Sequence, residues 1–190
     1  MLTPQEVRAV LSEIDAQQGY GSASFTQSLR LTYQRLTEHQ LGTDDLDYIE
    51  NLGGKILHQP IELIDGVKET LDYLGRRHHL SLLTRGDHDE QQQKVEQSGL
   101  AAYFQQVIIV AKKETMTYKN LAQEFGLDPT MSWMVGDSPR SDINPALQAG
   151  LNAVYIPQSS TWMIEQQELY QINTRQLLQL RAFTELRYYF

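Results

Sequence analysis

Apolar residues recur at helical spacing through the first third of the chain. Thr3 and Glu6 form a capping box with a proline between them, and the apolar side chains that follow lie on one helical face. The sequence therefore predicts a first helix from residue 4. Two further helices are predicted near 25–39 and 44–57, after glycine-containing breaks at 19–24 and 42–43.

From residue 67 onward, short apolar runs alternate with helical patterns. Each run is almost continuously apolar, which is typical of strands buried on both faces of a parallel sheet. We therefore predict an α/β, Rossmann-like fold, with helices on both faces of a parallel sheet. The tail from Gln158 on is predicted to be helical and peripheral. The predicted strands are 79–84, 106–111, 132–136 and 152–157.

Composition narrows the class of protein. The 190 residues suffice for one core and a small appendage. The chain has no cysteine, which excludes disulfides and thiol chemistry and fits a reducing cytoplasm. The longest apolar run, residues 107–111, is far shorter than the roughly 20 residues of a membrane helix, and the N-terminus does not resemble a signal peptide. We predict a cytoplasmic protein without a membrane segment.

The charge distribution argues against nucleic acid as a partner. Net charge is −8, and the cations are scattered, with Arg76-Arg77 and Lys112-Lys113 as the only adjacent pairs. A protein that binds a duplex usually carries a basic stripe. An anionic substrate would therefore need cations placed locally at its site.

Polar side chains follow three of the predicted strands. Asp137 and Asp142 follow the strand that ends at Gly136, Lys113 follows 106–111, and Thr84 ends 79–84. Singly, each is explained as a cap, a turn residue or a solvated charge. Because the carboxyl ends of parallel strands meet at one edge of the sheet, we expect these side chains to converge there.

The combination points to phosphate and a metal ion. Two carboxylates at one strand end repel each other unless a cation lies between them, and carboxylate oxygens suit Mg²⁺. The Thr84 hydroxyl and the N–H groups of Arg85 and Gly86 would suit a phosphoryl group, as would an ammonium group.

Three segments resemble the second, third and fourth motifs of the haloacid dehalogenase (HAD) superfamily of phosphohydrolases, in order. They are "LSLLTRGD", "KKETMTYKNLAQEFGLDP" and "WMVGDSPRSDINPALQAGLNAVYIP". The resemblance implies a partial α-helical cap domain over 1–62 and a HAD-like core over 63–190. It also implies a small phosphorylated substrate and Mg²⁺ as cofactor.

The resemblance also assigns roles to residues. Thr84 would bind the transferring phosphoryl group, and Lys113 would stabilise its charge. Lys113 is preferred to Lys112 because of its spacing from Tyr118. Asp137 would ligate Mg²⁺, and Asp142 would support it directly or through water. Arg85 stands where the family commonly has Asn, but that position mainly offers its backbone.

The first motif of the family, a strand ending in Asp-x-Asp, has no counterpart here. Its first Asp attacks phosphorus and its second acts as acid and base. Asp45-Leu46-Asp47 is predicted to open the third helix, and Asp87-His88-Asp89 follows a strand that the second motif already uses. We therefore expect the first central strand and the nucleophile to be missing. Unpaired edges would remain, at about 1–3 kcal/mol for each unsatisfied group. Either the two halves of the sheet close together, or another segment such as 185–190 or a partner's strand fills the gap, or the chain associates through those edges.

Three hypotheses remain. The first is a phosphatase whose first strand precedes this sequence and which is inactive as given. The second is a catalytically silent relative that binds a phosphorylated ligand or a protein. The third is a receiver-type signalling domain, which needs paired acids after its first strand and would not carry a cap. Retention of the four site residues favours the first. The loop 19–25 is either a cap loop that faces the site or a plain turn.

Overall fold

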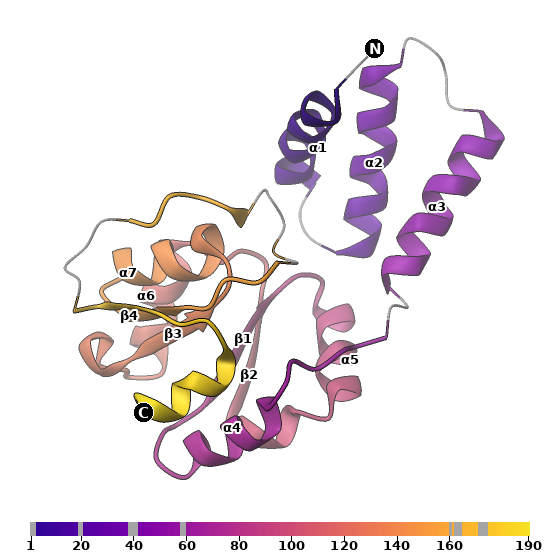
Figure 1. The fold of residues 1–190 in the computed structure, drawn as a ribbon. Helices are drawn as coiled ribbons and strands as arrows, with labels where there is room; N and C mark the ends of the chain where they lie inside the picture. The colour runs from indigo at the N-terminus through magenta and orange to yellow at the C-terminus, as the bar shows by residue number, and fades with distance from the viewer. Residues whose placement is uncertain are drawn as a thin grey trace. The chain divides into compact units, whose positions relative to one another are not determined.

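The protein is described from a computed structural model (Figure 1). The structure describes residues 3–18, 21–37, 42–57, 60–159, 161, 165–170 and 175–190. The chain divides into two compact units. The first comprises Met1–Glu62, Leu83–Gly99 and Ile108–Ala111, and the second comprises Leu63–Leu82, Leu100–Val107 and Lys112–Phe190.

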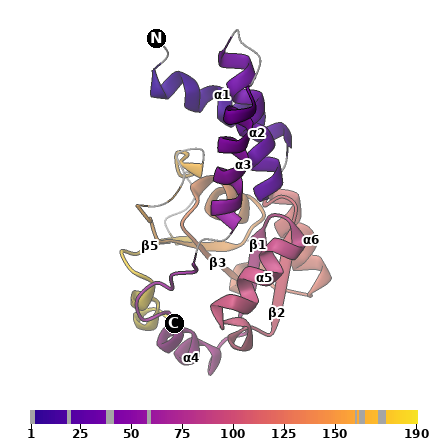
Figure 2. The same cartoon turned by 90° about the vertical axis from the view of Figure 1, so that its right-hand side faces the viewer.

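Three helices make up the N-terminal part of the first unit: α1 (Pro4–Gln18), α2 (Ser22–Leu36) and α3 (Thr43–Leu57). α2 packs against both α1 and α3 (Figures 1 and 2). The predicted capping box is confirmed, because the Thr3 N–H donates to Glu6 Oε2 at 2.8 Å and the Glu6 N–H donates to Thr3 Oγ1 at 3.3 Å.

α2 begins three residues before the predicted start, because the group that caps its N-terminus comes from a distant part of the sequence. The Ser22 N–H donates to both carboxylate oxygens of Glu90, at 3.1 and 3.0 Å, and the Ser22 hydroxyl donates to the same carboxylate. Glu90 lies in α5 (His88–Ser98), which ends at Gly99 as predicted. A carboxylate at a helix N-terminus satisfies N–H groups that have no partner within the helix.

Both Asp-x-Asp segments belong to helix starts, as predicted. Asp45 and Asp47 lie in α3. Asp87 caps α5, with its side chain accepting from the N–H groups of Asp89 and Glu90. Neither segment lies within a strand; Asp87 follows Gly86 beyond the end of β1 and serves as a helix cap.

The strands form two sheets, and within each sheet the strands run parallel. β1 (Ser81–Arg85) pairs with β2 (Gln106–Val110); the bonds from Gln105 N–H to Leu80 O and from Gly86 N–H to Val110 O give both strands the same direction. β3 (Trp133–Gly136), β4 (Asn152–Tyr155) and β5 (Leu177–Gln179) form the second sheet in that order, with parallel pairing throughout; Figure 1 labels β3 and β4. Among the described residues no strand pairing joins the two sheets. The predicted α/β class with parallel strands is confirmed.

The remaining elements are short. They are α4 (Val67–Gly75), η1 (Ala101–Tyr103), α6 (Thr115–Glu124), η2 (Pro129–Met131), η3 (Pro139–Ile143), α7 (Asn144–Gln148) and η5 (Phe183–Tyr188). In the described part of the chain no helix is long and apolar enough to cross a membrane.

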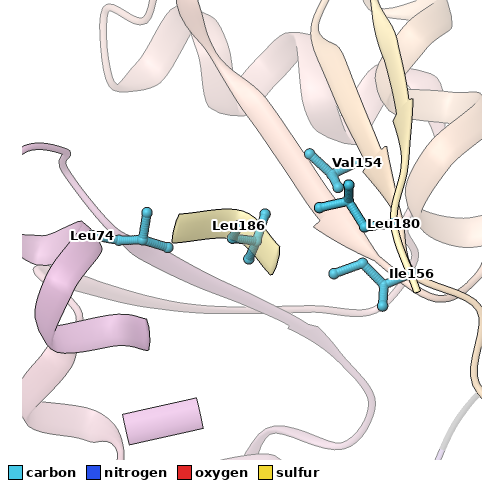
Figure 3. Close-up of a cluster of buried hydrophobic side chains, with 5 residues drawn as sticks. All are labelled: Leu74, Val154, Ile156, Leu180 and Leu186. Atoms are coloured by element: carbon cyan, nitrogen blue, oxygen red, sulfur yellow. The ribbon is translucent and has the colours of Figure 1, made fainter. Parts of the chain in front are cut away.

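The C-terminal tail belongs to the core of the second unit, so the prediction of a helical, peripheral tail was wrong. β5 pairs with β4, and Leu180 and Leu186 are only 3% and 1% exposed. Figure 3 shows these two side chains gathered with Leu74, Val154 and Ile156. A strand of three residues is too short to show a periodic pattern of apolar side chains, so it could not be predicted.

The last residues do not fill a gap in a sheet, contrary to one of the predictions. Residues 183–188 form a 3₁₀ helix that packs against α4. Phe190 then lies edge-on to the rings of Trp133 and His78, with ring centroids 5.1 and 5.9 Å apart. In this helical turn Leu186 is almost completely buried, which removes its apolar surface from water.

Candidate functional site

The loop that follows β3 carries both candidate metal ligands; residues 136–144 are called the acid loop below. Asp137 comes directly after the strand and is half-buried, whereas Asp142 is buried. Pro139–Ile143 form a π-helical turn in which the Ile143 N–H donates to Ser138 O at 3.1 Å. Wide turns of this kind frequently occur at functional sites.

Lys113 forms an ion pair with Asp142. Its Nζ lies 2.8 Å from Asp142 Oδ1, and the two side chains are 13% and 7% exposed. Lys112, the alternative candidate, is exposed. An ion pair removed from water is strong only when its geometry is good and its remaining oxygens are satisfied. Lys113 is therefore the lysine that the fold holds beside the acid loop.

The second oxygen of Asp142 is held against the end of β3. Oδ2 accepts from the Ser138 N–H at 3.1 Å. A Cβ atom on Gly136 would lie 2.3 Å from the same oxygen. Only glycine therefore lets the carboxylate rest at this position.

Asp137 accepts a hydrogen bond at Oδ2 from the Thr161 hydroxyl. Within the described residues no three His, Cys, Asp or Glu side chains cluster closely enough to hold a metal by themselves. Mg²⁺ needs only one or two carboxylates, completed by water and phosphate oxygens. The oxygens of Asp142 already bind Lys113 and Ser138. The two acids could thus supply part of a Mg²⁺ donor set, with Asp137 as a ligand and Asp142 supporting it directly or through water.

The candidate phosphate-binding residues lie in the first unit. Thr84 and Arg85 end β1, and the Thr84 hydroxyl donates to Gln91 Oε1 at 2.7 Å. The Gly86 N–H donates to Val110 O at 3.1 Å, so the sheet already uses one of the groups expected to bind phosphate. Gly86 has a φ of 150°, which favours glycine, and a Cβ there would lie 2.9 Å from Gln91 Nε2.

The structure thus brings Lys113 and Asp142 into contact and places Asp137 on the same loop. Thr84, Arg85 and Gly86 belong to the other compact unit. Sequence reasoning missed Gln91. Its side chain accepts a hydrogen bond from Thr84 and occupies the position where a Cβ atom on Gly86 would clash with it. Glutamine is frequent in this chain, so nothing marked this one.

Sequence reasoning also missed the residues that hold the acid loop. Glu165, which is 9% exposed, accepts hydrogen bonds from the hydroxyls of Ser138 and Ser141 at 2.6 and 2.5 Å. Tyr118 donates its hydroxyl to Ser141 O at 2.8 Å. The two serines stand in the acid-bearing motif, but Glu165 lies in a tail with no recognisable pattern.

The sequence matches a known protein family and several characterised relatives. The sequence pattern of the family described as "Haloacid dehalogenase-like hydrolase" matches residues 7–156. A phosphoserine phosphatase from Thermus thermophilus is 35% identical over 82 residues, which are 40% of this chain and 33% of the relative. An N-acylneuraminate-9-phosphatase from Mus musculus is 32% identical over 100 residues, which are 50% of this chain and 40% of the relative. The matches thus span well under half the length of either relative.

One solved structure is similar along nearly the whole chain. A haloacid dehalogenase-like family hydrolase from Xanthomonas campestris superimposes with a TM-score of 0.82 at 29% identity, covering 98% of this chain and 74% of that one. The family match covers more than half of the sequence, and the fold agrees with it. The chain belongs to the haloacid dehalogenase-like hydrolases.

Proposed function

We propose that the chain is part of a Mg²⁺-dependent phosphatase that acts on a small phosphorylated metabolite. The observation that carries the proposal is the buried ion pair between Lys113 and Asp142, because Asp142 shares the acid loop with Asp137. The two phosphatases among the relatives support this reaction class. In this proposal 1–62 is the α-helical cap and 63–190 the core. The lack of cysteine and the net charge of −8 favour a cytoplasmic enzyme that does not bind nucleic acid.

The chain's own residues would divide the work as follows. Lys113, held by Asp142, would stabilise negative charge on the phosphoryl oxygens. The Thr84 hydroxyl would turn from Gln91 to the phosphoryl group, next to the backbone of Arg85 and Gly86. Bound Mg²⁺ would neutralise charge on the phosphate oxygens. Asp137 would hold the metal directly.

The covalent step needs a carboxylate that attacks phosphorus while the ester P–O bond breaks and the leaving alcohol gains a proton. One Asp-x-Asp segment lies in α3, and the other follows the end of β1, where the Asp87 carboxylate caps the N-terminus of α5. We therefore propose that the attacking carboxylate lies outside these 190 residues. The chain as given would then hydrolyse no phosphate ester.

Hydrolysis of p-nitrophenyl phosphate with and without Mg²⁺ tests this proposal. We expect no turnover above buffer for the 190-residue chain. Adding the natural upstream sequence, if it encodes a strand ending in Asp-x-Asp, should give Mg²⁺-dependent turnover that D137N abolishes. Activity of the 190 residues alone that D137N abolishes would show that the nucleophile has been misassigned.

A silent binding protein is the second candidate. The observation that favours it is the Gly86 N–H, which bonds Val110 in the sheet and so does not point to a ligand. Such a protein would bind a phosphorylated ligand or a protein partner. If this candidate is correct, titration with inorganic phosphate should shift NMR resonances of the chain, while the chain with its upstream sequence added should show no turnover.

Self-association through sheet edges is part of the proposal. The described strands form sheets of two and three strands that do not pair with each other. Each sheet therefore has outer strands with unpaired N–H and C=O groups, which attract a further strand. Light scattering across a concentration series should give a mass that rises above 21.8 kDa. A constant monomer mass would contradict this part.

A further inference from the structure

The acid loop is held by side chains from a later part of the chain. Thr161 donates its hydroxyl to Asp137 Oδ2. Glu165 accepts the hydroxyls of Ser138 and Ser141, both at Oε2. Neither Thr161 nor Glu165 belongs to the motifs that identify the family, and both bind residues beside the proposed metal ligands.

A series of hydrogen bonds connects Glu165 with Lys113. The Ser138 hydroxyl donates to Glu165 at 2.6 Å and accepts from the Ser141 N–H at 2.9 Å. The backbone N–H of Ser138 then donates to Asp142 Oδ2, and Asp142 Oδ1 binds Lys113 at 2.8 Å. Because two hydrogen bonds hold the Ser138 side chain in place, its backbone N–H is positioned to donate to Asp142.

The same later segment is fastened to the acid loop at a second point. Asn144 Nδ2 donates to Glu168 O at 2.8 Å, and Asn144 Oδ1 accepts from the Tyr170 N–H at 2.7 Å. Asn144 is 6% exposed, and Ser138, Ser141 and Asp142 are buried to a similar degree. Buried polar groups of this kind are costly unless they are satisfied, so the segment is bound specifically.

We propose that Glu165 and Thr161 are positioning residues for the Mg²⁺ site. Glu165 orients Asp142 through Ser138, and Thr161 orients the carboxylate of Asp137. Outer hydrogen bonds of this kind typically change metal affinity by about 10–100-fold. The inference rests on the proposed metal-dependent function, and its test separates the two.

The geometry supplies a conservative variant. Both serine hydroxyls bond to one oxygen of Glu165, so the amide oxygen of a glutamine can accept both. E165Q should therefore keep the loop in place, whereas E165A removes both bonds. Glu168 provides the matched control. Its carboxylate is exposed and it holds Asn144 through its backbone, so E168A removes an acid from the same segment without breaking that bond.

The experiment is Mn²⁺ binding to the full chain, measured by electron paramagnetic resonance. We expect E165A and T161V to raise the Kd by about tenfold or more, E165Q to stay within about threefold of the wild type, and E168A to leave the Kd unchanged. S138A serves as a second variant if E165A does not fold, and it should weaken binding similarly. Wild-type affinity in E165A, or an equal loss in E165Q, would overturn the proposal.

Amide hydrogen exchange without metal separates this inference from the proposed function. In E165A the Ser138 N–H should exchange faster and the Lys113 resonances should shift, whether or not a metal binds. If wild type and D137N bind Mn²⁺ equally poorly, the proposed metal site fails, and the exchange result alone decides the positioning role. An unchanged Ser138 exchange rate in E165A would refute that role.

Discussion

Gly136 and Asp142 are in such close contact that a Cβ atom on the glycine would lie 2.3 Å from Asp142 Oδ2. The acid that pairs with Lys113 thus rests directly on the last residue of β3. Gly136 has no positive φ, so the requirement is one of space and not of backbone conformation.

G136A should therefore destabilise the second unit. The added methyl group must push away the Asp142 carboxylate, and overpacking of this kind costs about 1–3 kcal/mol. Urea unfolding followed by tryptophan fluorescence reports this unit, because Trp133 belongs to it. G75A is the matched control, since a Cβ there meets only Leu80 Cδ1 at 3.7 Å, an ordinary contact. Equal unfolding midpoints for the two variants would contradict this account.

Replacing Lys113 should cost more than replacing its neighbour. K113M keeps most of the apolar stem but leaves the buried Asp142 carboxylate without its cation, at a cost of about 3 kcal/mol. K112M changes an exposed side chain and should stay within about 0.5 kcal/mol of the wild type. Urea denaturation measures both.

The double variant K113M/D142N tests whether the two charges are coupled. Removing both charges leaves no unpaired ion, so the double variant should unfold at a higher urea concentration than K113M. A double variant less stable than K113M would indicate that the pair contributes no mutual stabilisation.

The tail can be tested by two substitutions two residues apart. Leu186 is 1% exposed and packs with Leu74 and Val154, so L186A should cost about 2–5 kcal/mol. Tyr188 is 82% exposed, and Y188A should be nearly neutral. Thermal unfolding by circular dichroism would distinguish them. Similar melting temperatures for L186A and the wild type would show that the tail does not belong to the core.

Asp128 should titrate below the usual range of aspartate. The Thr130 hydroxyl and then the Thr130 N–H donate to its carboxylate, at 2.6 and 2.9 Å, and lower its pKa. Because the folded pKa lies below the unfolded one, the stability from Asp128 is present above the unfolded pKa and is lost as pH falls through the folded pKa. NMR titration of the carboxyl carbon checks this in the wild type and in T130V.

T130V removes the hydroxyl donor but keeps the backbone donor. The pKa of Asp128 should therefore rise in this variant, yet stay lowered by the remaining N–H bond. An identical titration curve in both proteins would exclude the hydroxyl as the main cause.

Local signals made much of the fold predictable. The Thr3–Glu6 capping box, the glycine at 99 and the apolar strand runs each depend on neighbouring residues, and the structure agrees with them. The start of α2 was not predictable, because its cap is a carboxylate 68 residues away. β5 was missed because a strand of three residues is stabilised by pairing with its neighbour in the sheet, and its own sequence shows no periodic pattern.

The candidate site likewise contains contacts that could be predicted from the sequence and contacts that could not. Lys113 and Asp142 could be paired from the rule that strand ends converge, and the structure has them in contact. The roles of Gln91 and Glu165 depend on contacts between segments that carry no spacing signal. The use of the Gly86 N–H by Val110 also needed the register of β1 against β2.

The order in which the chain is synthesised gives the tail a further significance. Leu186 completes the core, and Glu165 and Thr161 hold the acid loop. During translation the acid loop leaves the ribosome well before these residues do. In the nascent chain the acid loop therefore lacks its hydrogen bonds to Thr161 and Glu165. The loop reaches its final geometry only after the segment with these two residues has docked.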